Sequence, residues 1–142
     1  MDELIYAGYD CRLTEEQKDM VSPFWFTIGR AYLFPENNYP CIIYNEKSES
    51  IGFINLCKWS GDEAVSWSFY IDKDHQGKGY GREAMKLALD FIRTFPCGES
   101  EYCWLSYDMK NEGARALYRA FGFVEQTDVY VEGGEMPAVL KL

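Results

Sequence analysis

The most informative stretch of this chain is Gln76-Gly77-Lys78-Gly79-Tyr80-Gly81-Arg82. It follows an alternating apolar segment, residues 64–71, and opens a segment with helical periodicity over residues 79–95. Three glycines in five residues leave backbone N–H groups uncovered by side chains, and the positive end of a helix dipole begins there. Because unpaired amides at a helix start bind anions, the stretch predicts a site for a pyrophosphate.

Two common nucleotide-binding patterns fit this loop less well. No window matches a P-loop, which requires a Gly-Lys-Ser/Thr end. The window from Gly79 to Ala84 does fit the dinucleotide pattern G-x-G-x-x-A, and the carboxylates Glu99 and Glu101 lie about twenty residues further on. However, a dinucleotide-binding turn follows its strand directly, whereas seven residues separate Ile71 from Gly79. From the loop alone, a glycine-rich turn without a ligand is also compatible.

A second run of sequence identifies the loop more specifically. Gln76, Gly79 and Gly81 match the Q/R-x-x-G-x-G/A loop of the GNAT superfamily of N-acetyltransferases. Residues 111–123 resemble the second signature of that superfamily, N-x-x-A-x-x-L-Y-x-x-F-G-F, about thirty residues downstream. The resemblance covers residues 40–142, and residues 15–21 look like the corresponding segment of bacterial polyamine acetyltransferases.

The composition is that of a single compact domain over residues 1–142, with 47% apolar and 17% aromatic residues. No run of eighteen apolar residues predicts a membrane span, and no signal peptide is visible. The five cysteines lack C-x-x-C spacing, so we expect no zinc or other metal site and no disulfide framework. Reduced thiols favour a cytoplasmic location.

The formal net charge of −9 makes nucleic acid a poor candidate partner. Basic residues gather around the glycine loop, at Lys73, Lys78, Arg82 and Lys86, where they favour a phosphate ligand. The acidic remainder of the surface favours a small cationic second substrate, although acidic surfaces also serve solubility alone.

The pattern of elements predicts an α+β fold. We expect a GNAT-like mixed, largely antiparallel central sheet flanked by helices on both faces. The expected helices are residues 23–33, 79–95 and 112–121, and the expected strands are residues 40–45, 51–58, 64–71, 101–107, 123–131 and 135–141. Domains of the superfamily usually open with a strand before the first helix, whereas this sequence begins at about that helix. We expect either that this strand is absent or that the reading frame starts late, and the sheet edge exposed by its loss favours a homodimer.

The resemblance implies that acetyl-CoA binds along the strand before the loop, at the loop itself and at the start of the helix after residue 111. In that arrangement the strand backbone bonds the pantetheine arm, and the loop amides hold the pyrophosphate. The implied cofactor-binding residues are Phe69, Tyr70, Ile71, Gln76, Gly77, Lys78, Gly79, Tyr80, Gly81, Arg82, Asn111, Ala114 and Tyr118.

Tyr118 is the implied catalytic residue, because the matching tyrosine of the superfamily acts as a general acid toward the departing thiolate. A thiol pKa near 8.5 and a phenol pKa near 10 make that proton transfer reasonable. Spacing alone favours a different interpretation, since Ala114, Leu117, Tyr118 and Phe121 form an apolar helical stripe typical of a core.

The base that deprotonates the amine is not identified. Relatives place a glutamate on the strand before the loop, where this chain has Trp67 and Ser68. A water relay ending at Glu36, Glu63, Asp72 or a C-terminal acid would serve. The missing carboxylate also supports a different class of protein, an acyl-CoA-binding module without transfer activity.

Analogy with the superfamily predicts that the amine binds among carboxylates and aromatic faces. The candidate residues are Tyr32, Glu36, Trp67, Glu132 and Glu135. Such a set suits a multiply charged amine, with spermidine or spermine as first choice. Aminoglycosides and protein N-termini are the alternatives.

Overall fold

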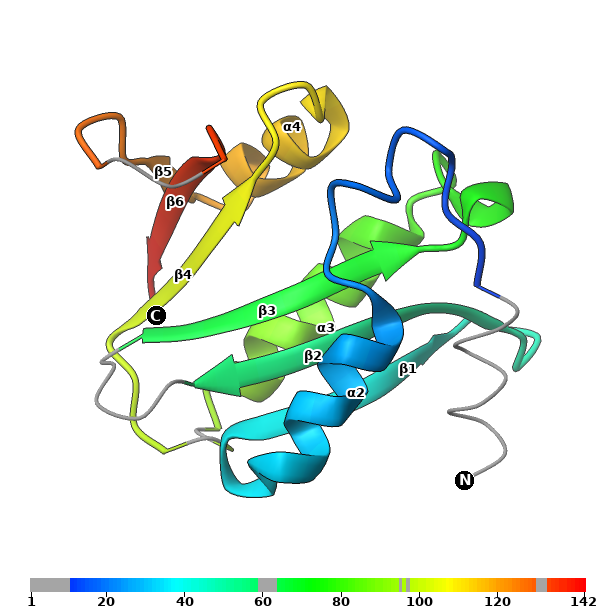
Figure 1. Cartoon of the computed structure of the whole chain (residues 1–142), viewed down its shortest axis with the longest axis horizontal. Coiled ribbons are helices and arrows are strands. Elements are labelled where there is room, and N and C mark those ends of the chain that lie inside the picture. Colours follow the sequence, from blue (N-terminus) through cyan, green and yellow to red (C-terminus); the bar gives the residue numbers. More distant parts are fainter. Residues whose placement is uncertain (1–10, 59–63, 95, 97, 130–132) are drawn as a thin grey trace.

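The computed structural model describes residues 11–58, 64–94, 96, 98–129 and 133–142. Six strands form one sheet in the order β1-β2-β3-β4-β6-β5, antiparallel except between β3 and β4 (Figure 1). The strands are β1 (Asn38–Tyr44), β2 (Ser50–Lys58), β3 (Ala64–Ile71), β4 (Tyr102–Tyr107), β5 (Val124–Glu125) and β6 (Met136–Lys141). The predicted α+β fold with a largely antiparallel sheet is confirmed.

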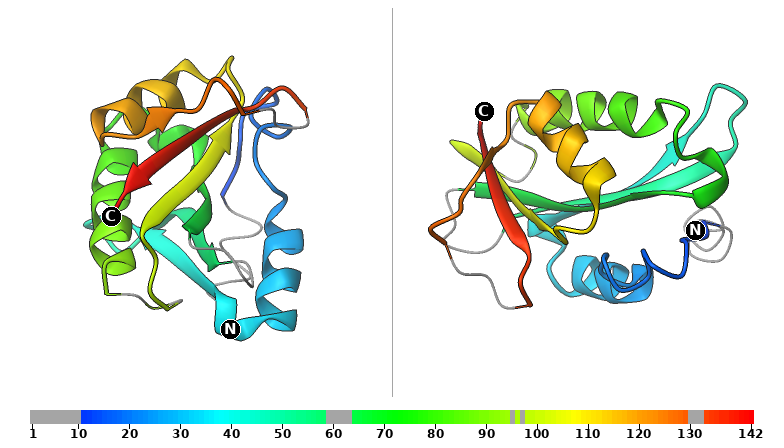
Figure 2. Two further views of the ribbon diagram at one scale, coloured as in Figure 1. Left: turned by 90° about the vertical axis from the view of Figure 1, so that its left-hand side faces the viewer. Right: turned by 90° about the horizontal axis from the view of Figure 1, so that it is seen from above.

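The helices cover both faces of the sheet, as expected. They are α2 (Phe24–Leu33), α3 (Tyr80–Ile92) and α4 (Glu112–Ala120), with two short 3₁₀ helices, η1 (Pro35–Asn37) and η2 (Lys73–His75). Figure 2 shows α3 and α4 on one face and α2 on the other. β3, α3 and β4 form a β-α-β unit with parallel strands, but η2 and the glycine loop separate the end of β3 from the start of α3, whereas a dinucleotide-binding turn joins the two directly.

Alternation along β3 supplies both faces with core residues. Val65, Trp67 and Phe69 pack into the larger core under α3 and α4. Tyr70 points to the opposite face and packs with Phe24 of α2 and Phe53 of β2. The strand is therefore held from both sides, and its backbone position is well determined.

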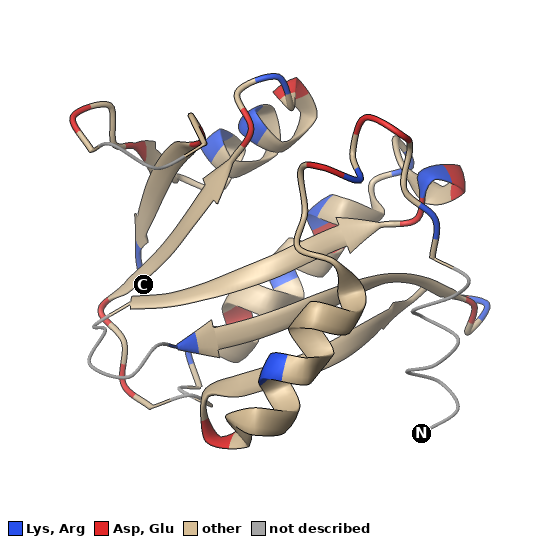
Figure 3. Cartoon of the chain, viewed as in Figure 1, with Lys and Arg blue, Asp and Glu red and all other residues tan. Residues whose placement is uncertain are grey.

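The two parallel strands separate soon after they begin. β3 and β4 pair only at Ala64 with Tyr102 and at Val65 with Cys103. Beyond these pairs β4 stays paired with β6 as far as Tyr107, so it follows β6 rather than β3. A gap opens in the middle of the sheet, and neither bordering strand carries a charged residue; the charges lie on the other strands, the helices and the loops (Figure 3).

Two elements are shorter than predicted. The strand expected over residues 123–131 is β5, Val124–Glu125, because the chain turns at Gln126. There the Gln126 N–H donates to the Pro137 carbonyl at 2.8 Å, and the Val129 N–H donates to the Gln126 carbonyl at 3.2 Å. Helix α3 ends at Ile92, three residues before the predicted end.

The segment before α2 is fastened to the loop that follows β3. The Arg12 N–H donates to Asp72 Oδ2 at 2.6 Å, and the Lys73 N–H donates to the Arg12 carbonyl at 2.8 Å. The side-chain amides of Gln17 and Gln76 bond each other reciprocally, at 3.1 and 3.0 Å. The start of the glycine loop is therefore hydrogen-bonded to the segment before α2, which lies on the opposite face of the sheet.

The expected loss of a first strand and the expected homodimer both stay predictions. In the described part of the chain the sheet begins with β1, after α2, and the expected loss of a first strand falls on residues 1–10, outside that part. The homodimer is likewise a prediction. No helix among the described residues is long and apolar enough to cross a membrane.

Candidate active site

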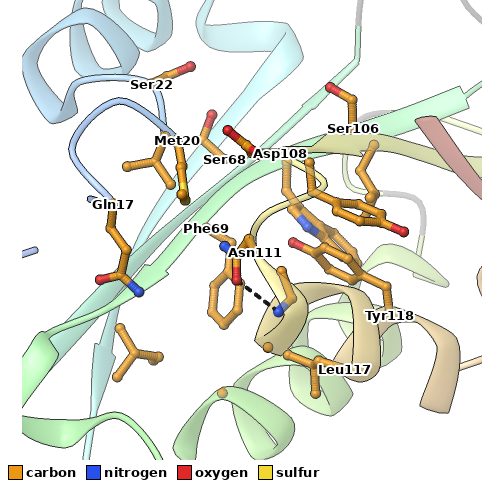
Figure 4. Close-up of a pocket in the computed structure, with 18 of the residues that line it drawn as sticks. Gln17, Met20, Ser22, Ser68, Phe69, Ser106, Asp108, Asn111, Leu117 and Tyr118 are labelled. Carbon is orange, nitrogen blue, oxygen red and sulfur yellow. Dashed lines mark hydrogen bonds between the residues drawn. The ribbon is translucent and has the colours of Figure 1, made fainter. Parts of the chain in front are cut away.

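A cavity of about 880 Å³ occupies the gap between β3 and β4. It extends from the glycine loop and the start of α4 to the segment before α2. Figure 4 shows Phe69 and Ser68 of β3 on one side and Ser106 and Tyr118 on the other. Its lining includes Gln17, Asp19, Met20, Arg30, Trp67, Ser68, Phe69, Ile71, Gln76, Gly77, Gly79, Gly81, Arg82, Ser106, Tyr107, Asp108, Asn111, Ala114, Leu117, Tyr118 and Glu135.

The glycine loop leaves room for a ligand at the start of α3. Gly77 and Gly79 adopt φ values of +71° and +91°, which side-chain-bearing residues rarely adopt. A Cβ added at either position would meet no atom within 4 Å, so the space above the loop is open. No side chain caps α3 at Gly79, and although the Arg82 N–H donates to the Gly79 carbonyl at 3.0 Å, the N–H groups of Tyr80 and Gly81 at the start of the helix are placed to bind an anion. The loop therefore has the open space and the N–H donors that an anion such as a diphosphate requires.

Most of the sequence-predicted cofactor residues line this cavity, and three do not. Lys78 and Tyr80 project elsewhere: Lys78 Nζ donates to the Asp74 carbonyl at 2.7 Å, and the Tyr80 hydroxyl donates to a Glu46 carboxylate oxygen at 3.0 Å. The side chain of Tyr70 packs in the core under α2. At positions 78 and 80, any contribution to the cofactor must come from the backbone.

Strand alternation also corrects the expectation for the Tyr70 backbone. The Asp72 N–H donates to the Ile51 carbonyl at 2.7 Å, which directs the backbone of Asp72 toward β2. Every second residue of an antiparallel strand bonds the same neighbour, so Tyr70 also bonds β2, opposite Phe53. Phe69 and Ile71 face the opposite way, toward the gap. Their backbone groups are the ones available to the cofactor.

Tyr118 lies at the junction of the gap and the core. Its side chain lines the cavity, only 8% of the residue is exposed, and its ring lies 5.5 Å from that of Tyr107. Burial raises the pKa of Tyr118 above its usual value, so the phenol is protonated at neutral pH. Helix α4, which carries it, is capped by Asn111, whose Oδ1 accepts from the Ala114 N–H at 3.0 Å (Figure 4).

A charged cluster fixes α4 and β4 to β5 behind Tyr118. Glu125 accepts two hydrogen bonds from Arg115, at 2.8 and 3.1 Å, and one from Arg119 at 2.9 Å. The Tyr107 hydroxyl donates to Glu125 Oε1 at 2.5 Å. The bonds from Arg115 and then Tyr107 lower the pKa of Glu125 to about 2. Burial and the Glu125 bond raise the pKa of Tyr107 to about 12.

We expect Glu125→Gln to lower the melting temperature at neutral pH, since it removes the charge that holds Arg115, Arg119 and Tyr107. Because the folded pKa of Glu125 lies below its unfolded value, its contribution is complete above the unfolded pKa, near 4.3. That contribution disappears as the pH falls toward 2. Thermal melts between pH 7 and pH 2.5 should show the two proteins converging in acid, and a constant difference would contradict this cause.

The other end of the cavity is polar and reaches the face covered by α2. Its charged lining residues are Asp19, Arg30, Asp108 and Glu135. The Ser106 hydroxyl donates to a Glu135 carboxylate oxygen, so the end of β4 and the segment before β6 meet there.

The residues predicted to bind the amine are only partly brought together. Glu135 and Trp67 line the cavity, although Trp67 does so from the core side. Tyr32 and Glu36 lie outside it, because α2 turns Phe24, Thr27 and Ala31 to the sheet and leaves Tyr32 83% exposed. Glu132 falls outside the described residues.

The residues predicted as the end of a proton relay are also only partly brought together at the cavity. Asp72 is buried beside the loop but does not line the cavity. Burial acts to raise its pKa, yet hydrogen bonds from the N–H groups of Arg12 and Asp74 bring that pKa below its usual value. Asp72 therefore fastens the loop. Glu63 is outside the described residues, and the C-terminal acid that reaches the cavity is Glu135.

Sequence reasoning missed several cavity residues. Gln17, Arg30, Ser106 and Asp108 carry no local signal, because each reaches the site from a segment whose place depends on the tertiary fold. Leu117 precedes Tyr118 in the second signature, and this position could have been found there.

Comparison with known proteins agrees with this architecture. Residues 9–123 match the Acetyltransferase (GNAT) family. The chain is 28% identical over 90 residues to L-amino acid N-acyltransferase MnaT of Escherichia coli (strain K12), a match that covers 61% of this chain and 51% of that protein. The chain thus spans about half the length of this curated relative.

Solved structures share the fold at low sequence identity. One is a chimera of the spermidine N-acetyltransferase SpeG from Vibrio cholerae and hSSAT, with TM-score 0.70, 19% identity and coverage of 99% of this chain and 91% of that one. Another is yncA, a putative acetyltransferase from Salmonella typhimurium with its cofactor acetyl-CoA, with TM-score 0.63, 19% identity and coverage of 84% and 74%.

The chain belongs to the acetyltransferase (GNAT) family, as its two signatures predicted. Membership confirms the predicted class of enzyme, an N-acetyltransferase, and the predicted cofactor of that class, acetyl-CoA. The open glycine loop and the gap between β3 and β4 are the features of this chain that fit the cofactor.

Proposed function

We propose that this protein transfers an acetyl group from acetyl-CoA to the primary amine of a small molecule. The observation that carries the proposal is a single cavity that joins an open glycine loop to a buried, protonated tyrosine. When bound, acetyl-CoA supplies the activated acetyl group. The amine then approaches from the polar end, near Ser106 and Glu135.

Each part of the chain has one task in this reaction. Backbone N–H groups of the loop hold the diphosphate, assisted by the nearby Arg82. The gap-facing backbone of Phe69 and Ile71 orients the cofactor along β3. Tyr118 then gives its phenolic proton to the departing thiolate sulfur.

The amine must lose a proton before it can react. An alkylammonium has a pKa near 10.4, so about one molecule in a thousand is free amine at neutral pH. Glu135, bonded by the Ser106 hydroxyl, is the cavity carboxylate that supports a proton relay for this step. Without such a relay the chain would be an acyl-CoA-binding module.

A polyamine such as spermidine or spermine is the first candidate acceptor. Asp19, Asp108 and Glu135 line the polar end and would bind ammonium groups. An L-amino acid is the second candidate, because Arg30 lines the same end and would bind a carboxylate. The similarity to an L-amino acid N-acyltransferase favours it as well.

Release of free thiol from acetyl-CoA, followed with a panel of amines, tests both candidates. If the acceptor is a polyamine, Glu135→Gln should raise KM for it by about tenfold or more, the size of one hydrogen bond to a charged group. If it is an amino acid, Arg30→Gln should raise KM similarly, and the amino acid amide, which lacks the carboxylate, should be the poorer acceptor.

The same panel includes aminoglycosides and peptides with free N-termini. Stabilisation of the protein by acetyl-CoA in thermal melts, without thiol release above background for any amine, would refute the transferase and favour the binding module.

A further inference from the structure

A buried hydrogen-bond donor lies unused in the cavity wall. Trp67 follows Val65, the last residue of β3 that pairs with β4, so it stands where the two strands separate. Only 8% of the residue is exposed, it lines the cavity, and among the described residues its indole N–H makes no hydrogen bond of normal geometry. Because an unpaired buried donor costs about 1–3 kcal/mol, such a group in a cavity wall points to an acceptor that arrives during function.

The nearest aromatic residue with an oxygen atom in that wall is Tyr118. The two rings are 6.4 Å apart between centroids and inclined by 35°. Phe123 packs against both, at 5.7 Å from Trp67 and 5.6 Å from Tyr118. Phe123 therefore confines both rings from behind and keeps the indole of Trp67 beside the phenol of Tyr118.

We propose that Trp67 is a positioning residue whose indole N–H hydrogen-bonds the Tyr118 oxygen when that oxygen becomes negative. The inference rests on the proposed role of Tyr118 as proton donor. In that step the phenolic O–H bond breaks, an S–H bond forms on the thiolate, and the electron pair stays on the phenolate oxygen. Trp67 keeps its own proton and stabilises this phenolate until solvent reprotonates it.

In the part of the chain that the structure describes, the other titratable side chains that face Tyr118 are Tyr107 and Cys103, both on β4. Burial raises the pKa of each, so both are neutral at physiological pH. The Tyr107 hydroxyl already donates a hydrogen bond to Glu125. Burial raises the pKa of Tyr118, and the nearby Trp67 indole N–H, as a hydrogen-bond donor toward the phenol, acts in the opposite direction and lowers it.

A titration of the protein without acetyl-CoA tests the bond directly. A fluorinated tyrosine incorporated at position 118 has a more acidic phenol, whose ionisation fluorine NMR reports. Trp67→Phe, which keeps an aromatic ring but removes the N–H, should raise this pKa by about one pH unit or more, the effect expected of a charge-assisted hydrogen bond. Trp104→Phe is the matched control, because Trp104 does not line the cavity. An unchanged pKa in Trp67→Phe would overturn the proposal.

A double-mutant cycle gives the second measurement. Trp67→Phe alone should lower kcat by about tenfold, with the dissociation constant of acetyl-CoA unchanged. In a Tyr118→Phe background, which has no phenolate to stabilise, the same substitution should have no further effect on kcat. An equal loss in both backgrounds would show that Trp67 acts only through packing, and would overturn the proposal.

The cycle also separates this inference from the proposed function. If Tyr118→Phe is fully active, the acid role fails and the inference fails with it. If Tyr118→Phe is slow but Trp67→Phe is as active as the unmodified protein, the acid role stands and the inference alone is wrong.

Discussion

Replacing Tyr118 by Phe is expected to lower kcat by about a hundred- to ten-thousand-fold, the usual contribution of a general acid. The change removes only a hydroxyl from a side chain that packs between Trp67, Tyr107 and Phe123, so the core should stay intact. Thiol release under saturating acetyl-CoA measures kcat, and calorimetry measures the dissociation constant, which should change by less than about threefold.

Tyr39→Phe is the control for this substitution, since it removes a phenolic hydroxyl from β1, away from the cavity. It should leave kcat unchanged. If Tyr118→Phe and the unmodified protein have equal kcat values, Tyr118 is not the acid. A fall in activity that parallels a fall in melting temperature would make its role structural.

Replacing Gly79 by Ala is expected to raise the dissociation constant of acetyl-CoA by at least about tenfold. At φ +91° an alanine is strained by about 1–3 kcal/mol, and relief of that strain moves the loop N–H groups that hold the diphosphate. The added Cβ also enters the open space in which the ligand would lie. Calorimetric titration with CoA and with acetyl-CoA should show the same loss for both ligands, because they share the diphosphate.

Gly98→Ala is the control that distinguishes a loss of stability caused by backbone strain from a loss of affinity for acetyl-CoA. Gly98 has φ +83°, an added Cβ meets no atom within 4 Å, and the residue does not line the cavity. Both variants should therefore lose comparable stability in thermal melts, and only Gly79→Ala should lose affinity. Equal affinities for Gly79→Ala and the unmodified protein would contradict the assignment of the diphosphate to this loop.

Much of the fold and one end of the site could be predicted before the structure was known. The strand over 64–71 and the helix after Asn111 were placed almost to the residue, because alternation and helix capping are local properties. The strand predicted over residues 123–131 was too long, because the bond between the Gln126 N–H and Pro137 joins the chain to a strand that follows it. The acceptor end was the least predictable part. Tyr32 and Glu36 lie outside the cavity, while Arg30 and Ser106 line it.

Local sequence is enough to specify the open glycine loop and the helix that carries Tyr118. Glycines at positive φ, a helix start without a side-chain cap and an asparagine cap all act within a few residues of chain, so composition and spacing reveal them. Contacts between distant segments specify which backbone edge of β3 faces the gap and which charged groups reach the polar end of the cavity. They also place the Trp67 indole beside Tyr118. These depend on the separation of β3 from β4, which is set by the pairing of β4 with β6 over thirty residues later in the chain.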